Sequence, residues 1–193
     1  MRIHIERKSL LGLGLGAVLL SACGPEVPEA DVLETGQVSQ RATNVLTNGS
    51  FESAPPLGYS HYITLSSSTT GLTGWTVQNS VHLMSNTYKT PAQGTRSIGL
   101  SYGGVSQTFP TVMGAGYTVY FSLSTSPGCA TSTRTMDVSV NGITYNFSTS
   151  SSSWTRLNFV FNAAGTSATI VFKNTYTNQA CGPAVDNISV LGP

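Results

Sequence analysis

Apolar and polar residues alternate with a period of two through much of the second half of the chain. The runs 117–123, 136–140 and 157–161 each place an apolar residue at every second position. Because successive side chains of a β-strand point to opposite faces, each run predicts a strand with one buried face. Asn141-Gly142 follows one such run and predicts a hairpin, since a type I′ turn needs positive φ at both central residues.

Shorter apolar runs extend this pattern along residues 44–193. They lie around Trp75, Val81, Ile98, Val105, Ile170 and Val185. Gly, Pro, Asn and Ser separate the runs, and no stretch of any length has the helical period. About ten short strands at this spacing predict an all-β fold, either a sandwich or a jelly roll.

The first 22 residues have the features of a lipoprotein signal peptide. Arg2, Arg7 and Lys8 precede the apolar run LLGLGLGAVLL, which is too short to span a bilayer comfortably. LSAC, residues 20–23, resembles the bacterial lipobox, in which the peptidase cuts before the cysteine and the thiol is acylated. The alternative is an ordinary signal peptide with a chance cysteine near its cleavage site.

An acyl chain such as palmitate on Cys23 would attach the exported protein to the membrane of the cell envelope. Gly24 rather than Asp follows this cysteine, which favours the outer membrane if the cell is Gram-negative. The stretch after Cys23 is rich in Pro and Glu and has no periodic apolar pattern. We therefore assign residues 23–43 to a flexible, lipidated tether and residues 44–193 to one β-sandwich domain.

The cysteine count predicts a disulfide. The chain has three cysteines, and if Cys23 carries lipid, Cys129 and Cys181 remain as an even pair. Exported proteins meet an oxidising environment, so we expect these two cysteines to be bonded to each other. Two buried free thiols are the alternative.

Charged residues are rare between residues 44 and 193. The acids are Glu52, Asp137 and Asp186, and the bases are Lys89, Arg96, Arg134, Arg156 and Lys173. These bases form no stripe, so we expect no nucleic-acid partner. A surface rich in hydroxyl and amide groups suits a neutral polyhydroxy ligand such as a polysaccharide, although many exported β-proteins share this composition.

Several motifs occur in a fixed order along the domain. They are NVLTNGSFES (44–53), GW (74–75), PAQG (91–94), Gln107, Cys129, the run from Trp154 to Ala163, and CGPAVDNI (181–188). Together they resemble the bacterial choice-of-anchor C domain and its plant cell-wall relative, domain of unknown function 642. The resemblance implies a galactose-binding-like β-sandwich and an association with wall polysaccharide. Val81-His82 and Ile98-Gly99 stand where the plant pattern usually has Val-Glu, so no ligand role of those acids is carried over.

Glu52 and Asp186 are candidate metal ligands. Glu52 ends the first strand motif and Asp186 lies in the last strand, and we expect these terminal strands to be neighbours. Two carboxylates in a partly buried place repel each other unless something positive separates them. A structural calcium ion would do so, because it accepts carboxylates and loop carbonyls. In the alternative, each acid accepts backbone amides of a nearby turn or pairs with Arg96.

Aromatic side chains in loops are candidate ligand contacts, because a sugar offers apolar C–H patches rimmed by hydroxyls. The candidates are Tyr59, His61, Tyr62, His82, Tyr88 and Tyr102, and we place the first three in a long Ser/Thr-rich loop. A loop tyrosine can instead simply cover the end of a sandwich. Trp75 and Trp154 are expected in or beside the core. Core positions are also expected for Phe121, Phe159, Phe161 and Phe172.

Catalysis is not expected. GLSYG, residues 99–103, matches the G-x-S-x-G nucleophile elbow, but an elbow needs a helix after its serine, and residues 104–109 have the pattern of a strand. The sequence therefore favours a non-catalytic, lipid-anchored cell-envelope protein that binds cell-wall or extracellular polysaccharide. The alternatives are a structural or adhesion module that recognises another envelope protein and, less favoured, a hydrolase.

Overall fold

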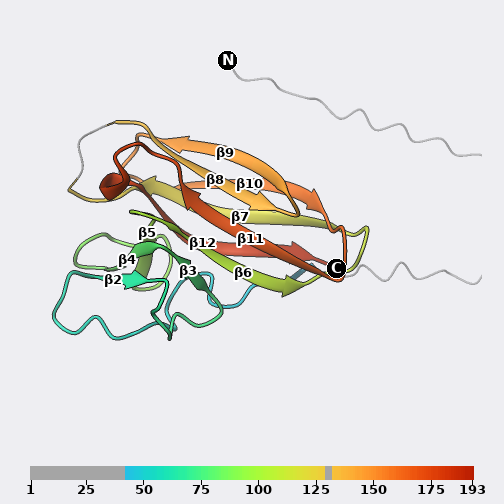
Figure 1. The fold of residues 1–193 in the computed structure, drawn as a ribbon, viewed down its shortest axis with the longest axis horizontal. Helices are drawn as coiled ribbons and strands as arrows, with labels where there is room; N and C mark the ends of the chain where they lie inside the picture. Colours follow the sequence, from blue (N-terminus) through green and yellow to red (C-terminus); the bar gives the residue numbers. More distant parts are fainter. Residues whose placement is uncertain (1–41, 129–131) are drawn as a thin grey trace, which may run out of the picture. The chain divides into compact units, whose positions relative to one another are not determined.

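The computed structural model describes residues 42–128 and 132–193 (Figure 1). All of them belong to one compact unit, Ser39–Pro193. This part of the chain contains no helix of the length and apolar character needed to cross a membrane. The signal peptide, Cys23, nearly all of the tether and Cys129 lie outside the described residues, so these assignments stay predictions.

The described residues form twelve strands and one short 3-10 helix, η1 (Gln179–Cys181). One sheet has the order β10-β7-β12-β5-β4-β2, with β1 beside β12. Its strands are β1 (Thr43–Asn44), β2 (Tyr62–Ser66), β4 (Ser80–Ser85), β5 (Arg96–Gly99), β7 (Gly116–Thr125), β10 (Thr155–Asn162) and β12 (Pro183–Gly192). The sequence predicted about ten strands, which is close to the twelve strands of the described residues.

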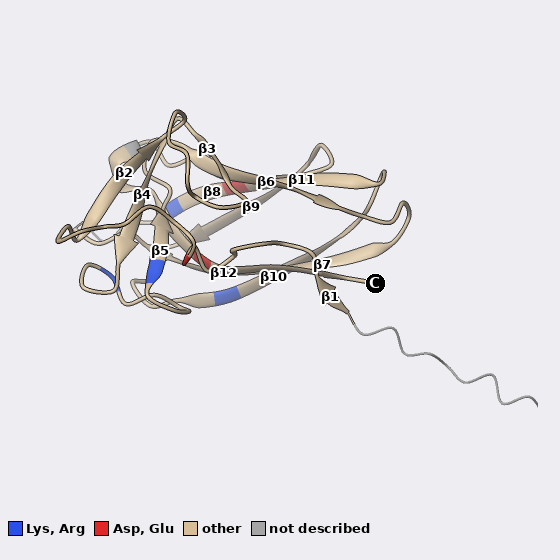
Figure 2. Cartoon of the chain, turned by 90° about the horizontal axis from the view of Figure 1, so that it is seen from below, with Lys and Arg blue, Asp and Glu red and all other residues tan. Residues whose placement is uncertain are grey.

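The second sheet has the order β3-β6-β11-β8-β9. Its strands are β3 (Thr76–Gln78), β6 (Gly104–Pro110), β8 (Arg134–Val140), β9 (Ile143–Thr149) and β11 (Ser167–Asn174). Figure 2 shows the two sheets as two layers. Neighbouring strands are antiparallel, for example in the pairs of β7 with β10 and of β6 with β11. The predicted all-β sandwich is confirmed.

The period-two runs bury one face as predicted. In β7 the inward positions Tyr117, Val119, Phe121 and Leu123 are at most 2% exposed. Phe121 lies at the centre, with its ring 4.9 Å from that of Phe147 and 5.4 Å from that of Phe172. The four phenylalanines expected in the core, Phe121, Phe159, Phe161 and Phe172, are all buried. These rings from both sheets hold the layers together.

Both tryptophans also occupy the positions expected of them. Trp75 is buried, and its Nε1 donates to the carbonyl of Asn48 at 2.9 Å. Trp154 is half-buried at the edge of the sandwich, and its Nε1 donates to the carbonyl of Thr90 at 2.8 Å.

The predicted hairpin at Asn141-Gly142 is confirmed. Both residues have positive φ, 51° and 78°. They connect β8 to β9, whose first register pair is Val140 with Ile143. The turn therefore has the backbone conformation that a tight antiparallel hairpin requires.

The two ends of the domain meet, as predicted. Thr43 pairs with Gly192 and Asn44 with Leu191 in the β1–β12 ladder. The next residue continues the contact, because the amide of Val45 donates to the carbonyl of Val190 at 2.9 Å.

Two local predictions were wrong. Glu52 does not end a strand, because β1 stops at Asn44 and the chain then turns through Asn48 and Phe51, whose φ values are 53° and 60°. Asn48 stabilises this loop by donating to the carbonyls of Ser53 and Thr73. Tyr62 does not lie in a loop but begins β2, which pairs with β4. The Ser/Thr-rich composition around β2 concealed a strand whose buried member is Leu65.

Candidate functional site

A loop between β4 and β5 is held by two carboxylates that are distant in sequence. Asp186, in β12, is 0% exposed. Its Oδ2 accepts hydrogen bonds from the amides of Ala92 (2.7 Å) and Gln93 (2.9 Å), and its Oδ1 accepts one from the amide of Asn187 (2.6 Å). The acid in the middle of the last strand therefore anchors this loop.

Glu52 holds the other end of the same loop. Its Oε1 accepts from the amides of Thr95 (2.8 Å) and Arg96 (2.9 Å), and its Oε2 accepts from the Thr95 hydroxyl (2.6 Å). Gly94 lies between the two anchored parts at φ 71°, and a Cβ at this position would collide with Glu52 Oε1. The glycine of the PAQG motif is required both by the backbone conformation and by the close approach of this carboxylate.

The two acids influence each other. Burial raises the pKa of Asp186 from 3.8 to about 7, and the negative charge of Glu52 adds to this rise. The hydrogen bonds from the amides of Gln93, Asn187 and Ala92 oppose the rise without cancelling it. The repulsion expected from the sequence is thus present, and backbone amides offset part of it.

This arrangement corresponds to the amide-binding alternative. The two carboxylates face N–H and O–H donors, whereas a calcium site needs oxygen ligands that converge on one point. Among the described residues no three His, Cys, Asp or Glu side chains are grouped so that they could hold a metal ion. The guanidinium of Arg96 donates to the carbonyls of Ala54 and Pro55 rather than to Glu52. The donors observed do not fit a calcium ion shared by Glu52 and Asp186, and calcium itself stays an untested prediction.

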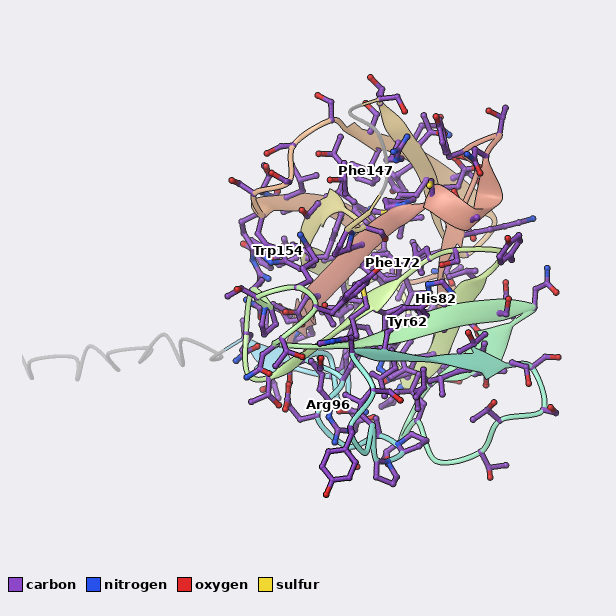
Figure 3. The ribbon with its side chains drawn as sticks, turned by 90° about the vertical axis from the view of Figure 1, so that its left-hand side faces the viewer. Tyr62, His82, Arg96, Phe147, Trp154 and Phe172 are labelled. Carbon is purple, nitrogen blue, oxygen red and sulfur yellow. The ribbon has the colours of Figure 1, made fainter. Side chains whose placement is uncertain are left out.

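Tyr88 of this loop joins an aromatic cluster, which we define as His61, Tyr62, His82 and Tyr88. The Tyr62 ring lies 4.6 Å from that of His82 and 5.0 Å from that of Tyr88, and the rings of His61 and Tyr88 are 6.5 Å apart. Figure 3 shows Tyr62 and His82 next to each other. Tyr62 is 40% exposed, so part of the cluster is open to solvent. Four of the six predicted contact residues are therefore brought together.

Hydrogen bonds join the end of β4 and the start of the loop to His61, just before β2, and fix this cluster. Ser85 donates to the carbonyl of His61 through both its amide (2.9 Å) and its hydroxyl (2.7 Å). Thr87 Oγ1 lies 3.1 Å from His61 Nδ1 and 2.8 Å from Ser85 Oγ. The amide of Tyr88 donates to the carbonyl of Ser85 at 3.1 Å. The rings are thus held on backbone that is itself constrained.

The other two predicted contact residues lie apart from the cluster. Tyr59 is fully exposed, at the tip of the loop before β2. Tyr102 is 48% exposed between β5 and β6, where its carbonyl accepts from Asn79 Nδ2. Neither ring is within stacking distance of the four rings of the cluster.

The serine of GLSYG does contact a histidine. Ser101 Oγ and His82 Nδ1 lie 2.9 Å apart, and burial lowers the pKa of His82. However, Ser101 is 1% exposed, and β6 starts at Gly104, as the sequence predicted, in place of the helix of an elbow. The geometry therefore places Ser101 as a buried partner that orients His82 within the cluster.

Lys89 connects the loop between β4 and β5 to neighbouring segments, and the sequence did not predict these contacts. Its Nζ donates to Ser124 Oγ (2.9 Å) and to the carbonyl of Ser152 (3.1 Å) and lies 4.6 Å from the centre of the Trp154 ring. Burial lowers the pKa of this amine. A single lysine in a polar loop carries no signal of such contacts in sequence. Lys89 and Trp154 together connect the loop to β7 and to the segment before β10.

The CGPAVDNI motif continues beyond Asp186 into a bulge. The β7–β12 register shifts between Asp186 and Ser189, and Asn187 has φ 51°. Cys181, at the start of the motif, is disulfide-bonded. Because Cys129 lies outside the described residues, the pairing of these two cysteines stays a prediction.

The fold is that of a jelly-roll β-sandwich, and similar solved structures share it. The CBM22-1-CBM22-2 tandem domain of Paenibacillus barcinonensis Xyn10C is 14% identical with a TM-score of 0.52, over 80% of this chain and 46% of that one. An arabinose-bound GH51 α-L-arabinofuranosidase is 13% identical with a TM-score of 0.53, over 79% of this chain and 27% of that one. At these identities the similarity concerns the fold.

The chain belongs to the DUF642 family, whose description is a protein of unknown function, and the family's model matches residues 44–191. One curated relative is halomucin of Haloquadratum walsbyi, which is 30% identical over 168 residues. The match covers 81% of this chain but only 2% of halomucin. Membership in the DUF642 family agrees with the resemblance found in the sequence motifs. The choice-of-anchor C part of that resemblance stays a prediction.

Proposed function

We propose that this chain is a non-catalytic carbohydrate-binding protein and that the aromatic cluster is its contact surface. The observation that carries this proposal is the grouping of Tyr62, His82, Tyr88 and His61 on constrained backbone with Tyr62 40% exposed. Aromatic faces stack on the apolar C–H patches of sugars, and the hydroxyl and amide groups around them match sugar hydroxyls. The Thr87 and Ser85 hydroxyls stand beside the cluster.

The fold supports the proposal. Two of the similar solved structures are a CBM22 tandem domain and an arabinose-bound arabinofuranosidase. The DUF642 match covers nearly the whole sandwich and leaves the first 43 residues outside it. We propose that those residues export the chain and tether it through lipid on Cys23 to the cell envelope. There the domain would bind cell-wall or extracellular polysaccharide.

The test is retention of the purified full chain in gels that contain polysaccharides chosen from a glycan array. Tyr62→Ala should reduce retention severalfold, because a stacking contact on one aromatic ring is worth about 0.5 to 1.5 kcal/mol. Tyr102→Ala is the matched control, since it removes an exposed tyrosine outside the cluster. Both variants should melt within a few degrees of the wild type, as surface substitutions usually do.

Loss of retention in Tyr62→Ala together with a large fall in melting temperature would assign this tyrosine to packing. If Tyr62→Ala and Tyr102→Ala reduce retention equally, the aromatic cluster is not the specific contact surface. If the array gives no sugar and a pull-down from envelope fractions gives one protein, the proposal is wrong and the adhesion alternative replaces it.

A further inference from the structure

The basic side chains of the described residues have different environments. Arg134 is 1% exposed and lies over the Tyr176 ring, and the Lys89 Nζ lies over the Trp154 ring and donates to Ser124 Oγ. Arg156 donates to the carbonyl of Asn187, and Lys173 stands opposite Asp137 in the β8–β11 register. Arg96 is the exception, because it lines a cavity of about 450 Å³. In Figure 3 this arginine appears below Tyr62 and His82.

The guanidinium of Arg96 keeps part of its donor capacity. Its Nη1 donates to the carbonyls of Ala54 (3.0 Å) and Pro55 (3.3 Å), both neutral groups. Guanidinium groups carry five N–H donors, and within residues 42–128 and 132–193 no hydrogen bond engages Nε or Nη2 of Arg96. These two nitrogens form one edge of the planar group, which fits the two oxygens of a carboxylate.

Glu52 does not neutralise this guanidinium by direct contact. Its oxygens accept from the backbone amides of Thr95 and Arg96 and from the Thr95 hydroxyl. The negative charge of Glu52 still lowers the affinity of the cavity for anions. A carboxylate in the cavity must therefore bind mainly through the paired N–H groups of Arg96 and not through a broad positive potential.

The cavity adjoins the aromatic cluster. Its wall is formed by residues 57–61, 85–87 and 95–96. His61 belongs to both the wall and the cluster, where its ring is 6.5 Å from that of Tyr88. Thr87, which also lines the cavity, has its hydroxyl 3.1 Å from His61 Nδ1. A chain-like ligand on the cluster can therefore place its next unit beside Arg96.

We propose that this cavity binds the carboxylate of an acidic sugar unit, so that the polysaccharide recognised contains uronic acid. The inference rests on the proposed function and specifies its ligand class. It differs from the neutral polyhydroxy ligand expected from composition, because the guanidinium edge and the cavity become visible only in three dimensions. Two aligned N–H donors to a carboxylate give a charge-assisted, directional contact.

The test compares polygalacturonate with the same polymer after methyl esterification, which removes the charge and leaves the backbone. The full wild-type chain should bind the acid form about tenfold or more tightly, since one charge-assisted pair accounts for at least one factor of ten. Arg96→Gln should abolish this difference while retention by the ester form stays the same. Lys173→Gln is the matched control, because it removes one exposed positive charge from the opposite sheet.

Several outcomes would overturn the inference. Equal binding of the two polymers by the wild type would do so even if Arg96→Gln fails to fold, because that comparison needs no variant. If Arg96→Gln and Lys173→Gln lose the preference for the acid form equally, that preference results from net charge and not from a site at Arg96. If neutral glycans retain the chain and no uronate polymer does, the acidic ligand is refuted and the proposed function stands. If no glycan retains the chain, both are refuted.

Discussion

Asp186 gives the sharpest test of how this domain holds the loop between β4 and β5. The Asp186→Asn variant keeps the size of the side chain but replaces one acceptor oxygen by an N–H₂ donor. In the wild type both carboxylate oxygens accept amides, from Ala92 and Gln93 on one side and Asn187 on the other. Asparagine can serve one side only, so at least one buried amide loses its partner. That loss costs about 1 to 3 kcal/mol.

The same substitution removes a buried charge, and this effect depends on pH. The pKa of Asp186 is raised from 3.8 to about 7 in the folded state, so the folded chain holds this proton more tightly than the unfolded chain. The stabilisation is therefore complete below pH 4 and is lost as the pH rises toward 7 and above. A shift of this size corresponds to about 4 kcal/mol at most, at 1.36 kcal/mol per pKa unit.

The assay is urea unfolding of wild type and Asp186→Asn at pH 4, 6 and 8, followed by tryptophan fluorescence. The free energy of unfolding of the wild type should fall relative to that of the variant as the pH rises, by up to about 4 kcal/mol. Asp137→Asn, on the other sheet, controls for net charge. The reasoning is refuted if the free energy of unfolding of the wild type rises relative to that of the variant as the pH rises. That result would mean that the amide hydrogen bonds lower the pKa of Asp186 more than burial raises it.

The remaining predictions concern the same loop and the untested sites. Gly94→Ala should lower the free energy of unfolding by about 1 to 3 kcal/mol, since alanine is strained at φ 71° and its Cβ meets Glu52; unchanged urea midpoints would contradict this. The bond predicted between Cys129 and Cys181 should appear as one cross-linked peptide in non-reducing mass spectrometry, and a free thiol at either position would disprove it. If calcium binds, a chelator should lower the melting temperature; an unchanged midpoint with no metal by elemental analysis would dismiss the ion.

The sequence predicted what depends on neighbouring residues. Strands follow from period-two burial because the side-chain direction alternates with each residue, as in β7 around Phe121. The β8–β9 hairpin follows from Asn141-Gly142 because the turn conformation is a local property of two residues. Where local composition was ambiguous the prediction was wrong, as for Tyr62, which begins β2 within a Ser/Thr-rich stretch.

The candidate site was only partly predictable. The sequence named Tyr62, His82 and Tyr88 as separate candidates and did not foresee that they contact one another. It selected Glu52 and Asp186 as an interacting pair because the first and last strand motifs were expected to be neighbours, but their hydrogen-bond partners were left open. Arg96 appeared only as a possible partner of these acids. Its cavity lies between chain segments that are remote in sequence.

The amino-acid sequence by itself thus determined the class of fold, the positions of most strands and the meeting of the two ends of the domain. The tertiary structure decided what the acids and the rings do. Ala92 and Asp186 are 94 residues apart in sequence, and Glu52 and Thr95 are 43 apart, yet each pair is joined by a hydrogen bond. Side-chain alternation acts over one or two residues, whereas desolvation and hydrogen bonding depend on whatever the fold brings within about 3 Å.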